Sequence, residues 1–236
     1  MTRLWIGFVV VGFLLSWILT GCGRSEPRDA TQLAAALLVP EEIGARWKVD
    51  DAPTDGGLDP SGIVTDEQRE MLPSVDMCDR ADSGSHRAAT ALRWQAFRQY
   101  VMRVDGPVDP PVDRRGHMVF AQEFLMSGRE SEIAWLFDRL KRGLEACMGA
   151  IPAGEEGPGE ATPVAMSIAG GHHVAVLYRI EEAGGRGMWN VYSAFVRRGS
   201  VLLGFTLADV RLGDLEPIVD EKMLNRIVGV ALVALG

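Results

Sequence analysis

Residues 188–208, MWNVYSAFVRRGSVLLGFTLA, decide the fold, because they contain two segments of strand length separated only by Arg198-Gly199. We interpret this dipeptide as a tight turn, and strands that a tight turn joins run antiparallel. The predicted strands are therefore 188–198 and 200–208. Two more segments with the pattern of a strand, 162–169 and 173–181, precede them. Four consecutive strands are therefore expected in this half of the chain.

An alternating pattern predicts two further strands nearer the N-terminus. Polar and apolar residues alternate over 91–97, ALRWQAF, as they do on a half-exposed strand. We predict strands over 88–104 and 117–126, joined by the proline-rich residues 106–116.

Helix signals flank these strands. Residues after Ser127 or Ser131 are amphipathic, and Pro217 falls in the first predicted turn of the last helix, where a missing N–H costs little. The predicted helices are 29–39, 65–72, 127–147 and 215–235, with a shorter turn over 40–44. Residues 50–62 and 149–163 are predicted to be loops.

The resulting order, ααββαββββα, predicts an α+β fold with a mostly antiparallel sheet of about six strands and helices packed on it. The composition, 47% hydrophobic and 24% charged, is typical of an ordered globular domain. The formal net charge of −8 argues against nucleic acid and anionic lipid headgroups as partners.

The N-terminus has the layout of an export signal, with Arg3 ahead of the uncharged run Leu4 to Leu19. Leu19-Thr20-Gly21-Cys22 resembles the lipobox of bacterial lipoproteins at all four positions. The resemblance implies that residues 1–21 are a cleaved signal peptide. It also implies that acyl chains such as palmitate, joined through Cys22, hold the mature chain on the extracytoplasmic face of the cell membrane. The alternative is an uncleaved anchor helix with a chance cysteine.

The mature chain divides into a lipidated tether, 22–32, and a domain, 33–236. Its other cysteines are Cys78 and Cys147, and an even pair in an exported domain favours a disulfide. Two buried free thiols or a metal site are the alternatives. Neither cysteine has a second Cys or a His at ligand spacing, which weakens the metal interpretation.

Several short motifs resemble the PknH-like extracellular sensor domain family of actinobacteria. They are Leu38-Val39-Pro40-Glu41-Glu42-Ile43-Gly44, Cys78 ahead of a strand containing Trp94, Phe124 through the helix ending Glu145-Ala146-Cys147, and the four-strand-plus-helix ending. The resemblance covers residues 33–236. It implies a strongly twisted antiparallel sheet with helices on both sides, conserved cystines and a cleft for an unidentified ligand. This chain departs from the family in having only one mature cysteine pair. It has no kinase segment, so the resemblance does not imply direct signalling through a cytoplasmic kinase.

Catalytic patterns are weak, and we expect no enzyme activity, no cofactor and no metal. Neither a GxSxG elbow nor an HExxH pair is present. Ser85-His86 could join a triad only through folding that the sequence does not show. His172-His173 would point to opposite faces of a strand, and His117 is isolated.

A candidate ligand-binding set follows from strand alternation, which places polar side chains with an aromatic residue on the sheet. Its members are Arg93, Gln95, Glu123, Arg179, Asn190 and Tyr192. The alternative is that these residues form the solvated face of an antiparallel sheet. The functional hypothesis is a ligand-binding or sensor-like lipoprotein whose ligand is a small molecule or an envelope component. An envelope lipid carrier and an envelope hydrolase are the alternatives.

Replacing the lipobox cysteine tests the anchor. Cys22→Ser is expected to abolish acyl labelling and to leave the precursor uncut, because serine offers no thiol for the lipid. Labelling with a palmitate analogue and detergent partitioning measure this, with Ser25→Ala as the control that keeps both. Unchanged labelling and partitioning in Cys22→Ser would contradict the prediction.

Overall fold

The computed structural model describes residues 26–50, 61–65, 93–102, 117–154, 157–168, 171–181, 187–212 and 215–236. The described helices are α2 (Ala30–Ala35), α3 (Pro40–Ile43), α6 (Glu130–Ala146) and α7 (Glu221–Ala234). The described strands are β1 (Trp47–Val49), β2 (Ala96–Met102), β3 (His117–Ser127), β4 (Gly149–Gly154), β5 (Gly157–Pro163), β6 (His172–Glu181), β7 (Gly187–Arg198) and β8 (Val201–Leu212).

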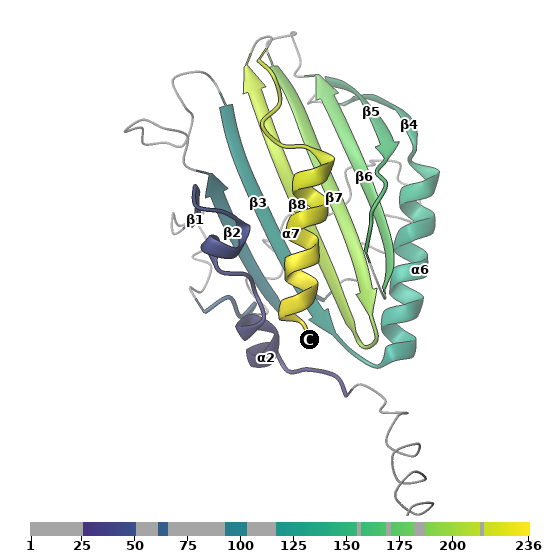
Figure 1. The fold of residues 1–236 in the computed structure, drawn as a ribbon. Helices are drawn as coiled ribbons and strands as arrows, with labels where there is room; N and C mark the ends of the chain where they lie inside the picture. Colours follow the sequence, from purple (N-terminus) through teal and green to yellow (C-terminus); the bar gives the residue numbers. More distant parts are fainter. Residues whose placement is uncertain are drawn as a thin grey trace, which may run out of the picture.

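These strands form one sheet in the order β1-β2-β3-β8-β7-β6-β5-β4, and every neighbouring pair is antiparallel (Figure 1). The tight turn at Gly199, which has a φ of 58°, joins β7 to β8. Strand β8 pairs with β3 on its other side over the whole of β3. It therefore joins the N-terminal and C-terminal parts of the sheet.

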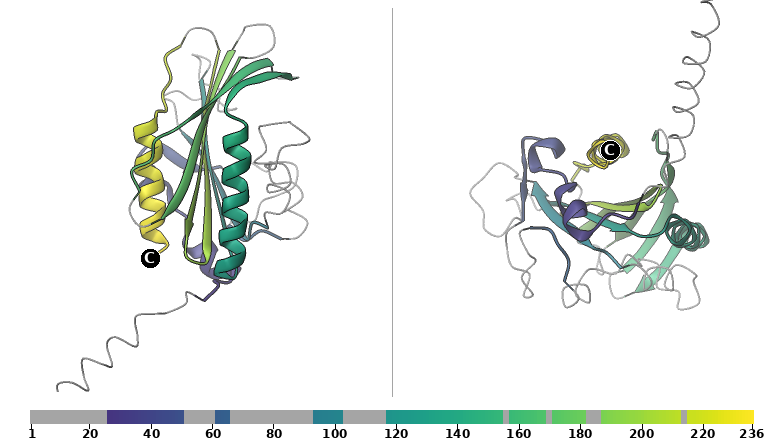
Figure 2. Two further views of the ribbon diagram at one scale, coloured as in Figure 1. Left: turned by 90° about the vertical axis from the view of Figure 1, so that its right-hand side faces the viewer. Right: turned by 90° about the horizontal axis from the view of Figure 1, so that it is seen from below.

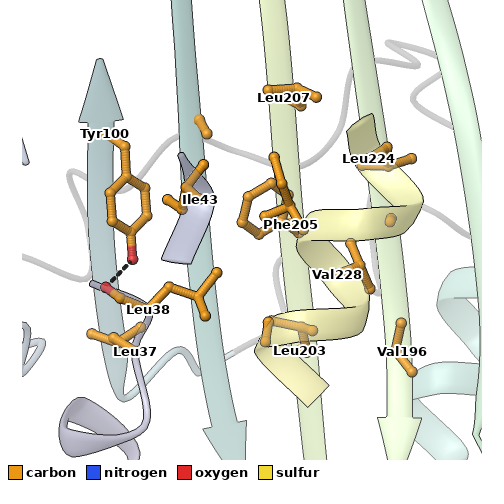
Figure 3. Close-up of a cluster of buried hydrophobic side chains, with 14 of the residues drawn as sticks. Leu37, Leu38, Ile43, Tyr100, Val196, Leu203, Phe205, Leu207, Leu224 and Val228 are labelled. Carbon is orange, nitrogen blue, oxygen red and sulfur yellow. Dashed lines mark hydrogen bonds between the residues drawn. The ribbon is translucent and has the colours of Figure 1, made fainter. Parts of the chain in front are cut away.

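Helices cover both faces of the sheet, as the two views of Figure 2 show. Helices α2, α3 and α7 lie on one face, which we call the α7 face. Its core includes Leu203, Phe205 and Leu207 from alternate positions of β8, packed with Leu224 and Val228 of α7 (Figure 3). The period of two in the strand and of about four in the helix brings these side chains together.

The opposite face, which we call the α6 face, carries a second apolar core. Leu136, Phe137 and Leu140 of α6 belong to the same cluster as Phe195 and Leu202 from the sheet. Both faces are thus apolar over most of the long strands, which explains why the sequences of β7 and β8 are nearly continuous apolar runs.

The α+β class and the antiparallel sheet are confirmed, but the prediction of about six strands was too low, since the described residues form a sheet of eight. Strand β1 is three residues long, too short to show a period. Residues 149–163, predicted as a loop, form the hairpin β4–β5. Proline is tolerated in a strand at a sheet edge, which is where β4 lies, so Pro152 does not prevent this pairing.

Several boundaries also differ from the sequence predictions. The predicted strand 162–169 ends at Pro163 as β5, and the strand predicted from residue 88 is described only from Ala96. The first helix ends at Ala35. The last helix starts at Glu221, capped by Asp220, so Pro217 precedes it rather than lying in its first turn.

Some predictions lie outside the described residues: Cys22, Cys78, Ser85-His86 and most of the predicted helix 65–72. Cys147 is described at the C-cap of α6, where it is buried. Lipidation and the Cys78–Cys147 disulfide therefore stay predictions. None of the helices in the described part of the chain is both long and apolar enough to cross a bilayer.

Gly204 on β8 tests the packing of the α6 face. A Cβ there would lie 3.0 Å from the Trp94 ring and 3.2 Å from the Phe195 ring. Gly204→Ala is therefore expected to lower the free energy of unfolding by roughly 1–3 kcal/mol, because the rings must shift.

The matched control is Gly229→Ala on α7, where an added Cβ meets nothing within 4 Å. This change is expected to raise the free energy of unfolding by about 0.5–1 kcal/mol, because alanine favours helix. Urea unfolding measures both variants. A Gly204→Ala protein as stable as the wild type would contradict the packing.

Candidate functional site

Five polar or aromatic residues lie together on the α7 face, near the start of α7, and we call them the Asn190 cluster. They are Arg179 on β6, Asn190 and Tyr192 on β7, and Asp209 and Arg211 on β8. Arg179 lies opposite Asn190, which lies opposite Asp209. Directly opposed residues share a face, as do residues two apart on one strand, so all five side chains share the α7 face.

The chain that leads from β8 into α7 is bound to two residues of this cluster. Figure 1 shows how this chain turns from the end of β8 back to the start of α7. The Ile218 amide donates to Asp209 Oδ2 at 2.6 Å, and the Arg211 guanidinium donates to the Leu215 carbonyl. Asp220 then caps α7 by accepting from the Met223 amide at 2.7 Å. Asp209 and Arg211 thereby fix where α7 starts, and they hold residues 215–220 beside Asn190 and Tyr192.

The charges around Tyr192 are mixed. Burial raises the pKa of its phenol, and the Arg179 guanidinium works against that rise, while Asp220, Glu221 and Asp209 add to it. The phenol therefore stays protonated at neutral pH and can donate a hydrogen bond. Positive and negative groups both lie within electrostatic range of one aromatic ring.

Two buried polar atoms of the cluster have no hydrogen-bond partner among the described residues. They are Asn190 Oδ1, an acceptor, and Arg211 Nε, a donor. The Asn190 residue is only 6% exposed. An unsatisfied buried polar group costs about 1–3 kcal/mol, so such atoms call for a partner.

Glu123 of the predicted ligand set also lies on the α7 face, but the α2–α3 connection covers it. The Leu38 amide donates to Glu123 Oε2 at 2.9 Å, and Tyr100 Oη lies 2.8 Å from the same oxygen. Arg98 donates to the Leu38 carbonyl at 2.9 Å. These contacts fasten the α2–α3 connection to the sheet.

The proton on Glu123 decides which hydrogen bonds can form among Tyr100, Glu123 and the Leu38 carbonyl. Tyr100 Oη lies 2.8 Å from both Glu123 Oε2 and the Leu38 carbonyl oxygen, yet a phenol can donate only once (Figure 3 shows the bond to Leu38). Both contacts become hydrogen bonds when Glu123 carries a proton. Burial raises the pKa of Glu123 to about 7, against the lowering effect of the Leu38 amide, Tyr100 and Arg98.

Arg93 and Gln95 lie away from the Asn190 cluster. Both precede β2, and Gln95 Oε1 accepts from the Ser127 amide at 2.8 Å, where β3 ends. Strand β2 is four strand spacings, about 19 Å, from the β6 strand of Arg179, which lies near the opposite end of the sheet. The structure therefore brings Arg179, Asn190 and Tyr192 together but separates Arg93 and Gln95 from them. Their ligand roles stay predictions.

The histidines considered in the sequence show no metal-type arrangement. His172 is exposed and His173 half-buried on adjacent β6 positions, so their side chains lie on opposite faces. Within the described ranges, no three His, Cys, Asp or Glu side chains come close enough together to hold a metal ion.

Sequence reasoning missed Asp209 and Arg211, because the predicted strand ended at residue 208 and β8 continues to Leu212. The alternation of β8 would have placed both residues on the face of Leu207, had the strand been extended. Arg98 and Tyr100 were missed for another reason, since their partner Leu38 lies about 60 residues earlier in the chain.

No protein-family model matches the sequence, and no curated protein matches it. Two solved structures align with most of the chain. The uncharacterized Rv0999 ortholog of Mycobacterium smegmatis is 13% identical, with a TM-score of 0.41, over 90% of this chain and 98% of that one. The extracellular domain of PknH from Mycobacterium tuberculosis is 14% identical, with a TM-score of 0.48, over 89% and 98%. Similarities of this size do not decide a ligand or an activity.

The Glu123 proton predicts a pH dependence of stability. A folded pKa of about 7 against an unfolded value of 4.5 means that the folded state binds the proton more tightly. This contribution to stability is fully present below pH 4.5 and is lost as the pH rises through 7. Its size is roughly 2–4 kcal/mol.

Glu123→Gln removes the titration and keeps an oxygen acceptor. Relative to the wild type, the variant is expected to gain roughly 2–4 kcal/mol between pH 4 and pH 8. Urea unfolding at both pH values measures the difference. Glu41→Gln, on the exposed side of α3, is the control. A stability difference between Glu123→Gln and wild type that does not change with pH would contradict the assignment.

Proposed function

We propose that the chain is an extracytoplasmic lipoprotein, anchored through Cys22, that binds a small polar ligand at the Asn190 cluster and catalyses no reaction. The observation that carries the binding role is the pair of buried, unpartnered atoms, Asn190 Oδ1 and Arg211 Nε, on the same face of the sheet as Tyr192. The lipobox at Leu19 to Cys22 supports the anchor and the location.

The donors and acceptors of the cluster indicate the chemistry of the ligand. Asn190 Oδ1 needs a hydroxyl or amine hydrogen, whereas Arg211 Nε needs an acceptor. Arg179 is exposed and offers a planar guanidinium that suits a carboxylate or phosphate. We therefore propose a small molecule that carries a hydroxyl or amine together with an anionic group.

The lipid-carrier alternative would need an apolar cavity, and apolar strand residues such as Val174, Val176, Leu202 and Phe205 could line one. Val176, Leu202 and Phe205 are buried members of the two cores, and Val174 packs against the core of the α6 face. Helix–sheet packing therefore already accounts for these side chains, and the polar cluster favours a polar ligand.

Mass spectrometry of small molecules extracted from the purified native domain tests the proposal. The wild type is expected to release a polar molecule that Arg179→Gln no longer retains, with the free energy of unfolding changed by less than about 0.5 kcal/mol. Arg93→Gln is the matched control and should retain the molecule, because Arg93 lies near the other end of the sheet.

Two outcomes would contradict the proposal. Equal loss of the polar molecule from Arg93→Gln and Arg179→Gln would remove the Asn190 cluster as the binding site. An extracted acyl lipid, with no polar molecule, would favour the carrier instead.

A further inference from the structure

We infer that the domain stands on the membrane in one fixed orientation, with the end that receives the tether against the phospholipid headgroups and the Asn190 cluster pointing away. We call this end the base: the tether at Glu26–Arg28, the β3–α6 junction, the β7–β8 turn and the C-terminal end of α7. The inference rests on the proposed lipidation of Cys22.

The tether is fastened to the base by a chain of hydrogen bonds. The Arg28 amide donates to Ser127 Oγ at 2.9 Å, and Ser127 Oγ in turn donates to the Ser200 carbonyl at 3.0 Å. Ser200 Oγ donates to the Glu26 carbonyl at 3.3 Å. The Arg28 guanidinium also donates to the Leu235 carbonyl at the end of α7. The chain is therefore held against the domain from Glu26 onward.

The distance from the lipid to this contact is short. Only Gly23, Arg24 and Ser25 separate Cys22 from Glu26, and four residue steps span at most about 14 Å. The headgroup layer of one leaflet takes up about 5–8 Å of that reach. A lipid on Cys22 therefore brings the base to the membrane surface.

The chemistry of the base suits phospholipid headgroups. Arg198 donates to the Leu232 carbonyl at 2.6 Å, and together with Arg28 it offsets the negative end of the α7 dipole. Arg197 lies close by on the β7–β8 hairpin, and Arg129 lies on the β3–α6 junction, where it also pairs with Glu132 at 3.5 Å. Four arginines from three segments are therefore placed at the base of an otherwise acidic chain, where guanidinium groups suit lipid phosphates.

An exposed apolar side chain marks the same end. Val233, on the last turn of α7, is 78% exposed, more than Trp135 at 51% or Val39 at 47%. Trp135 lies instead on the outer side of α6, under the Arg139 guanidinium at 5.1 Å. Val233, between the carbonyls that Arg28 and Arg198 cap, is placed to reach the headgroup–acyl boundary.

The Asn190 cluster lies at the opposite end of the sheet from the base. Strand β8 leaves the base at Val201 and reaches Asp209 and Arg211 eight and ten residues later, about 26–33 Å away. The start of α7 lies at that end too, about 21 Å along the helix from its C-terminus (Figure 1). With the base on the membrane, the cluster lies at the end of the sheet away from the membrane.

Photocrosslinking to lipid tests the orientation. Benzoylphenylalanine replaces Val233 at the base, Lys222 at the distal start of the same helix, or Trp135 on the side of α6. Each full-length lipidated protein is placed in vesicles of phosphatidylethanolamine and phosphatidylglycerol in equal amounts, irradiated, and analysed for phospholipid adducts by mass spectrometry.

The expected result is several-fold more adduct at position 233 than at 222 or 135. Adding Arg28→Ala and Ser200→Ala should reduce that preference, whereas Arg139→Ala should leave it unchanged. Equal adducts at the three positions, or more at 222 or 135, would overturn the orientation while leaving the anchor intact. A protein without acyl label that does not bind vesicles would overturn the anchor and the orientation with it.

Discussion

The pairing of β8 with both β3 and β7 is the constraint on which the rest of the structure depends. The tight turn at Gly199 fixes its register with β7, and the eleven-residue ladder with β3 transfers that register to the N-terminal strands. A shift by one residue would turn Leu203, Phe205 and Leu207 away from α7. It would also bring a leucine or a phenylalanine to the place where Gly204 now leaves room for the Trp94 ring. Both helix layers are therefore positioned by one strand.

Strand β8 runs from the base to the end of the domain that carries the Asn190 cluster. Its first residues adjoin the Ser127–Ser200 contact that receives the tether, and its last residues, Asp209 and Arg211, hold the connection into α7. Helix α7 returns toward the base and is capped there by Arg28 and Arg198. Anchoring and binding are thus proposed at opposite ends of a single rigid layer, which would keep a bound ligand clear of the lipid headgroups.

The sequence predicted β3, β6 and β7 to within one residue at each end, because these strands have ten or more residues. It predicted the start of β8 equally well but missed its last four residues. It failed for β1, which is too short for a period, and for β4, where an edge position permits Pro152. Pairing of β6 with β7 allowed Arg179, Asn190 and Tyr192 to be grouped. The Glu123–Leu38 contact could not be foreseen, since it joins residues 85 positions apart and depends on how the α2–α3 connection crosses the sheet.

Hydrogen–deuterium exchange of the lipidated protein, on vesicles and in detergent, tests most directly whether the base lies on the membrane and the end with the Asn190 cluster does not. The account predicts slower exchange on vesicles for amides at the base, in residues 127–130, 198–201 and the last turn of α7, with residues 215–223 unchanged. Slower exchange in residues 215–223, with the base unchanged, would contradict it.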